Sequence, residues 1–150
     1  MKAKHFLQPG QLVISVEPMQ ITTILGSCIA VCLWDSQRRI GGMNHFMLPM
    51  FGGGTAKSSA RFGNVAMQSL LDALRDAGAR LPFLQARVFG GACMFEPMRS
   101  AAHLGQKNAE VALDFLSGHA IEIVQIETGG SRGRKLTYET DGGTACLASI

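Results

Sequence analysis

The sequence predicts one mixed α/β (α+β) domain with an extensive sheet and two or three helices. The chain has 150 residues, a length that suits a single domain with a sizeable core. Its composition, 47% hydrophobic and 17% charged, is typical of a globular protein. Strand patterns arrive in runs and do not alternate strictly with helices, so a doubly wound parallel fold is not expected.

The first third of the chain predicts four strands, because short apolar stretches rich in β-branched residues alternate there with Gly, Pro or polar residues. The expected strands are 11–16, 20–25, 28–34 and 39–48. The polar turn at 35–38 predicts that the last two form a hairpin, which brings His45 back toward Cys28. Gly41 and Gly42 indicate a bulge or the close approach of another backbone.

The rest of the chain predicts two amphipathic helices and four more strands. Residues 64–77 carry an apolar stripe that ends before Gly78, and residues 106–116 carry another that ends before Gly118. The expected strands are 85–89, 120–126, 135–139 and 145–150. The last two flank Asp141-Gly142-Gly143, a strong hairpin signal.

Composition also narrows the class of protein. The longest apolar run, residues 29–34, is far too short to span a bilayer, and no signal-peptide core forms near the start. We therefore expect a cytoplasmic domain covering residues 1–150, with residues 1–10 loose and no membrane insertion. The net charge of +3 is too mild to indicate nucleic-acid binding.

The four cysteines are too few and too irregularly spaced for a disulfide scaffold, and no C-x-x-C pair indicates zinc. Cys32 and Cys93 are expected to be small buried hydrophobes. Cys28 differs because it follows Gly26-Ser27, where the backbone can turn and expose N–H groups that would hold an oxyanion. His45 arrives seventeen residues later in an apolar stretch.

A cysteine beside an imidazole predicts nucleophilic catalysis, because the histidine can convert the thiol to the thiolate. The plainer alternative is a buried cysteine and a core histidine held by backbone hydrogen bonds. Thr22 or Thr23 could orient the imidazole, and strand alternation alone does not choose between them. The loop at 49–60 is either a lid over the site or a plain connection.

Several motifs in order resemble the chemoreceptor glutamine deamidase family (CheD), from about Leu12 to the C-terminus. They are Leu25-Gly26-Ser27-Cys28 with Thr22 six residues before the cysteine, His45 before Met47-Leu48-Pro49, and the segments 61–67, 88–92, 104–108 and 129–134. Cys93, Gln106-Lys107 and Ser131-Arg132 depart from the usual family pattern.

The resemblance implies a mixed β-sandwich with flanking helices, similar to toxin-type cysteine deamidases, and a protein-glutamine glutaminase that needs no cofactor or metal. It assigns a catalytic triad to Cys28, His45 and Thr22, the threonine being chosen by its offset. Backbone amides near Gly26 and Ser27 would hold the oxyanion, and a glutamyl thioester would form as ammonia leaves. The expected substrate approach consists of Phe51, Gly53, Arg61 and Asn64.

Two other functions stay open. The same site could hydrolyse glutamyl methyl esters, because a thioester forms more easily from an ester than from an amide. The chain could instead be a regulatory module for a CheC-type chemotaxis phosphatase, with residues 49–51 and the exposed helix faces as docking surfaces. The expected partners are thus receptor cytoplasmic helices and a CheC-type phosphatase, without nucleic acid, and the chain is expected to be a monomer.

Overall fold

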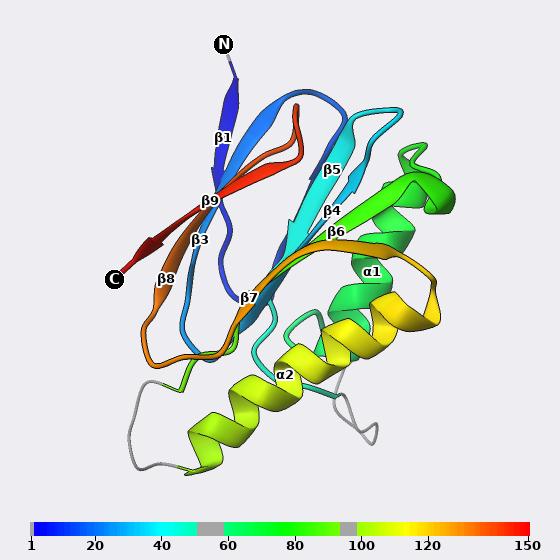
Figure 1. Ribbon diagram of the computed structural model, residues 1–150. Helices are drawn as coiled ribbons and strands as arrows, with labels where there is room; N and C mark the ends of the chain where they lie inside the picture. Colours follow the sequence, from blue (N-terminus) through cyan, green and yellow to red (C-terminus); the bar gives the residue numbers. More distant parts are fainter. Residues whose placement is uncertain (1, 51–58, 94–98) are drawn as a thin grey trace.

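The computed structural model describes residues 2–50, 59–93 and 99–150 and shows a mixed α+β domain in three layers (Figure 1). In the described part of the chain, nine strands form two sheets, accompanied by two α-helices and a 3-10 turn at Leu81–Phe83. One layer, here called the outer sheet, has the order β1-β3-β8-β9. The middle layer, the central sheet, has the order β2-β5-β4-β6-β7. The helices α1 and α2 form the third layer, on the other face of the central sheet.

The bounds of the elements follow. In the outer sheet they are β1 (Ala3–Phe6), β3 (Met19–Leu25), β8 (Arg134–Glu139) and β9 (Thr144–Ser149). In the central sheet they are β2 (Leu12–Ser15), β5 (Ile40–Asn44), β4 (Ile29–Asp35), β6 (Leu84–Gly90) and β7 (Glu122–Thr128). The helices are α1 (Gly63–Asp76) and α2 (Arg99–Gly118). Pairs β1/β3 and β6/β7 are parallel and the others antiparallel, so both sheets are mixed.

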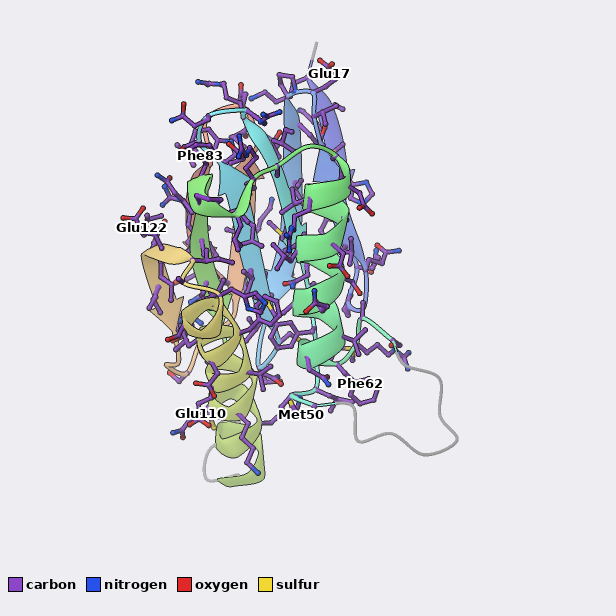
Figure 2. The ribbon with its side chains drawn as sticks, turned by 90° about the vertical axis from the view of Figure 1, so that its right-hand side faces the viewer. Glu17, Met50, Phe62, Phe83, Glu110 and Glu122 are labelled. Atoms are coloured by element: carbon purple, nitrogen blue, oxygen red, sulfur yellow. The ribbon has the colours of Figure 1, made fainter. Side chains whose placement is uncertain are left out.

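Strand β4 is covered on both faces, which explains its continuous apolar sequence. Ile29, Val31 and Leu33 pack in the core beneath the helices. Ala30 and Cys32 point the opposite way and join the core between the two sheets. The side chains of the helical layer fill the space between α1, α2 and the central sheet (Figure 2). The two cores therefore meet at the strand that begins next to Cys28.

The turn between β4 and β5 is fixed by Asp35, a fully buried carboxylate. Its two oxygens accept hydrogen bonds from the backbone N–H groups of Gln37, Arg38 and Arg80, each at 2.8 Å. Burial by itself would raise the pKa of this carboxyl, but the three N–H donors outweigh it and the pKa is lowered. The charged Asp35 thus sets the hairpin that leads the chain back to His45.

Most sequence-based expectations for the elements are confirmed, with bounds shifted by a few residues. Helix α2 is longer than expected and begins at Arg99, before its apolar stripe starts. The expectation of a loose N-terminus is wrong. Strand β1 lies there, paired with β3, and Leu7 is fully buried. The backbone pairing of β1 holds it in place although its side chains are exposed, so no apolar alternation marks it in the sequence.

Neither helix in the described residues is long and apolar enough to cross a bilayer.

Gly42 supports a specific prediction about the close backbone approach expected from the sequence. A Cβ at this position would lie 2.6 Å from the Val13 carbonyl oxygen and 2.6 Å from a methyl carbon of Ile14. Gly42→Ala should therefore push β2 away from β5 and lower the free energy of unfolding by about 1–3 kcal/mol in urea denaturation. Gly118→Ala is the control, because a Cβ there meets no atom within 4 Å. Equal stability of the two variants would contradict this account.

Candidate active site

Cys28 lies in the turn that joins the two sheets, immediately before β4. Every backbone carbonyl of the segment Gly26-Ser27-Cys28 accepts a hydrogen bond. The donors, in that order, are the N–H of Ala92 (2.9 Å), the Nδ2 of Asn108 (3.1 Å) and the N–H of Gly91 (2.8 Å). The carbonyls of this turn are therefore held by the segment that follows β6 and by α2.

The N–H groups of the same turn are left available. No described residue is recorded as accepting a hydrogen bond from the backbone N–H of Ser27 or Cys28. Two neighbouring N–H donors beside a half-buried thiol form the arrangement that stabilises an oxyanion in acyl transfer. The expectation that backbone amides near Gly26 and Ser27 hold an oxyanion stays a prediction, for which the N–H groups of Ser27 and Cys28 are the candidates.

His45 follows β5 and continues its pairing with β4. Cys32 lies opposite Met43, and Ile29 exchanges two backbone hydrogen bonds with Phe46 at 3.0 and 2.9 Å. The same register makes Cys28 and His45 diagonal neighbours on one face of the central sheet, the face that points toward the outer sheet. Cys28 packs against the core between the sheets, which agrees with this placement. The predicted hairpin thus brings the two residues to one face.

The imidazole of His45 is held by Thr23 of the outer sheet. The Thr23 hydroxyl oxygen lies 2.7 Å from His45 Nδ1 and donates its hydrogen to the Leu7 carbonyl at 2.8 Å. Because a hydroxyl has one hydrogen, it must then accept from Nδ1–H. The neutral ring therefore carries its proton on Nδ1, and Nε2 keeps a free lone pair. Nε2 is buried and has no hydrogen-bond partner among the described residues.

The expectation that Thr22 orients His45 is wrong in its geometry. Thr22 and Thr23 are successive strand residues, so their side chains lie on opposite faces of the outer sheet. Thr22 lines an open cavity of about 480 Å³ on the outward face, together with Lys4 and Lys135. Thr23 is fully buried and faces the core between the sheets. The residue that contacts the imidazole is therefore Thr23.

Burial keeps both the Cys28 thiol and the His45 imidazole neutral. It raises the pKa of the Cys28 thiol above its ordinary value, an effect that the nearby backbone N–H only partly offsets. It also lowers the pKa of His45 to about 4. Near pH 7 the thiol therefore keeps its proton, and the neutral imidazole has a free lone pair on Nε2.

Two residues of the expected substrate approach, Phe51 and Gly53, lie outside the described residues. Arg61 is exposed, and its backbone carbonyl accepts hydrogen bonds from the N–H groups of Met47 (2.9 Å) and Leu48 (3.0 Å). Asn64 lies in the first turn of α1. These two positions therefore lie on the segment that supports the chain just after His45.

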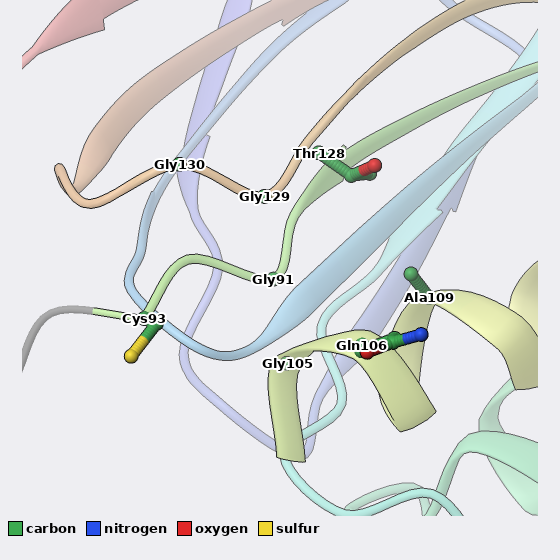
Figure 3. A pocket seen from close by; sticks show the side chains of 8 residues that line it. All are labelled: Gly91, Cys93, Gly105, Gln106, Ala109, Thr128, Gly129 and Gly130. Carbon is green, nitrogen blue, oxygen red and sulfur yellow. The ribbon is translucent and has the colours of Figure 1, made fainter. Parts of the chain in front are cut away.

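A cavity of about 340 Å³ lies between α2, the segment that follows β6 and the turn that follows β7 (Figure 3). Its lining includes Gly91, Gln106, Gly129 and Cys93, which is half-buried and less enclosed than expected. The Gly129 N–H donates to the Gly90 carbonyl at 2.9 Å, so this N–H is already used within the fold. Among the described residues, no group of three His, Cys, Asp or Glu side chains could hold a metal ion.

The chain is similar to one protein family over most of its length. The family model for CheD, described as CheD chemotactic sensory transduction, matches residues 47–149. A probable chemoreceptor glutamine deamidase CheD 1 of Anaeromyxobacter dehalogenans is 45% identical over 99% of this chain and 86% of its own length. A probable chemoreceptor glutamine deamidase CheD of Trichlorobacter lovleyi is 42% identical over 96% and 89%, and one of Sulfurimonas denitrificans is 37% identical over 98% and 94%.

The low pKa of His45 predicts how stability depends on pH. Between pH 6.5 and about 4 the imidazole is protonated in the unfolded chain but stays neutral in the folded protein. Since the unfolded state then binds the extra proton, lowering the pH across this window should cost up to about 3 kcal/mol of stability. His45→Gln should lose this part of the slope when urea denaturation is repeated at each pH. Parallel curves for the two proteins would show that His45 has an ordinary pKa.

Proposed function

The chain belongs to the CheD family, and on that basis we propose that it is an amide hydrolase that converts glutamine side chains of chemotaxis receptors to glutamate. One observation supports this most strongly: the Thr23 hydroxyl assigns the His45 proton to Nδ1 and leaves Nε2 free on the face that carries Cys28. A neutral base, a thiol and two free backbone N–H groups are the parts that amide hydrolysis through a thioester requires.

The reaction begins when Cys28 Sγ attacks the carboxamide carbon of the substrate and passes its proton to His45 Nε2. The C–S bond forms, and the carbonyl oxygen becomes an oxyanion that the N–H groups of Ser27 and Cys28 stabilise. Thr23 keeps accepting from Nδ1–H while the ring is charged, which holds the imidazolium in place. Because His45 is buried, its imidazolium form is unfavourable, and the ring readily gives up the proton on Nε2.

Nε2–H then protonates the amide nitrogen, the C–N bond breaks, and ammonia leaves a glutamyl thioester on Cys28. Water attacks the thioester carbon while the neutral Nε2 takes one of its protons. The C–S bond breaks, the sulfur recovers a proton from the imidazolium, and glutamate is released. Each proton passes through the same nitrogen, which explains why Nε2 has no structural hydrogen bond among the described residues.

Peptide mass spectrometry of a receptor cytoplasmic fragment, with an ammonia assay, tests the proposal. The protein should convert defined glutamines to glutamates and release one ammonia for each. Cys28→Ala should lose at least about 10³-fold in rate, whereas Cys146→Ala, at an exposed cysteine of β9, should match the unaltered protein. Methanol release from methylated fragments without ammonia would indicate an esterase instead. A fragment that binds the protein but stays unchanged would indicate a regulatory module.

Thr22 and Thr23 form a matched pair that separates geometry from sequence offset. Thr23→Val keeps the shape of the side chain but leaves Nδ1–H and the Leu7 carbonyl unpaired. We expect kcat to fall by about 10- to 100-fold, because an unpaired buried polar group costs roughly 1–3 kcal/mol and the tautomer is no longer fixed. Thr22→Val, on the outward face, should stay within about twofold, since such surface changes alter stability little. The reverse ranking would restore Thr22 as the orienting residue.

A further inference from the structure

Asn108 is a fully buried polar side chain on α2 that the proposed mechanism does not use. Its Nδ2 donates two hydrogen bonds, one to the Ser27 carbonyl at 3.1 Å and one to the Met47 carbonyl at 3.0 Å. The first acceptor directly precedes Cys28, and the second lies two residues after His45. One amide group therefore joins the two segments that carry the nucleophile and the base.

The orientation of this amide is well determined although it leaves one atom unsatisfied. The Asn108 Oδ1 is buried and has no hydrogen-bond partner among the described residues. Turning the amide over would place Oδ1 against two carbonyl oxygens, which have no hydrogen to donate. A buried oxygen without a hydrogen bond costs free energy. The amide nevertheless keeps the orientation in which its Nδ2 donates both hydrogen bonds.

The bond to Ser27 has a consequence for the oxyanion donors. The peptide between Ser27 and Cys28 is planar, and in a trans peptide the carbonyl and the following N–H point in opposite directions. Fixing the Ser27 carbonyl toward α2 therefore aims the Cys28 N–H away from α2. An oxyanion formed on a carbon attached to the Cys28 sulfur would lie within reach of this N–H.

We propose that Asn108 is a positioning residue that sets the oxyanion site by holding the Ser27–Cys28 peptide in one orientation. This inference rests on the proposed hydrolase function and adds a residue to it. Asn108 itself touches no reacting atom: it acts through the peptide plane. Its loss should therefore impair steps that develop negative charge on oxygen and spare reactions of the sulfur that do not.

The test compares two reactions of Cys28 in the full chain. The first is glutamine conversion in a receptor fragment, measured as kcat and KM. The second is alkylation by iodoacetamide, which occurs at a saturated carbon and creates no oxyanion. In Asn108→Ala, kcat should fall about 10- to 100-fold, while KM and the alkylation rate stay within about twofold. Asn108→Ser keeps one hydroxyl donor, so its kcat should lie between that of Asn108→Ala and that of the unaltered protein.

Leu116→Ala is the control for helix stability, because Leu116 is fully buried on α2 and packs in the core beneath the helices. It should keep kcat within about twofold at temperatures where it is folded. Equal kcat values for Asn108→Ala and Leu116→Ala would overturn the inference. So would a parallel loss of conversion and alkylation, which would mean that Asn108 only holds the site together. If Asn108→Ala does not fold, the same comparison on Asn108→Ser decides.

These results are distinct from a failure of the proposed function. If the unaltered protein converts no glutamine, or if Cys28→Ala still does, the hydrolase proposal is overturned and the role of Asn108 falls with it. If conversion depends on Cys28 but is unaffected by both Asn108 variants, only the role of Asn108 is overturned.

Discussion

A buried chain of two hydrogen bonds between the sheets holds the candidate site together. It runs from His45 Nδ1–H to the Thr23 hydroxyl and from that hydroxyl to the Leu7 carbonyl. The first bond joins the central sheet to the outer sheet. The second depends on the N-terminal strand, whose parallel pairing with β3 continues as the Leu7 N–H donates to the Thr22 carbonyl at 2.8 Å. These groups are shielded from water. Losing one of them would therefore leave its hydrogen-bond partners unpaired, which would lower the free energy of unfolding.

The same dry interface sets the chemistry of the pair. In an exposed site a cysteine and a histidine can rest as thiolate and imidazolium, but burial here disfavours both charged forms. The reaction proposed above therefore creates charge only during attack, when the oxyanion meets the two backbone N–H groups and the imidazolium meets Thr23. In the proposed reaction, the core between the sheets, against which Cys28 packs and in which Thr23 is buried, would therefore contribute to catalysis as well as to stability.

Much of this arrangement could be predicted from the sequence, because it follows from local patterns. Apolar alternation located the strands, and a polar turn located the hairpin that returns His45 toward Cys28. The orienting threonine could have been found by a closer use of the same rule. Ile21 and Leu25 are two residues either side of Thr23 and are fully buried, whereas Ile24, on the face of Thr22, is 47% exposed. The alternation showed that the two threonines face apart, and the offset suggested by the family resemblance selected the outward one.

Other parts depend on contacts between distant segments. Strand β1 has exposed side chains and is held by backbone hydrogen bonds to β3, so no apolar pattern in the sequence predicts it. Asn108 lies in a helix predicted correctly by its apolar stripe, yet its importance comes from two carbonyls 61 and 81 residues away. Such contacts become visible only when α2 is packed on the end of β4.

The position of the proton on His45 is the most direct test of this account. In protein labelled with nitrogen-15 at histidine, NMR at pH 7 distinguishes a protonated ring nitrogen from one that carries a free lone pair, and a His45→Gln sample assigns the signals. We predict a neutral ring with its proton on Nδ1 and a bare Nε2. A neutral ring protonated on Nε2, or a ring protonated on both nitrogens, would contradict the central claim that Thr23 prepares Nε2 as the base.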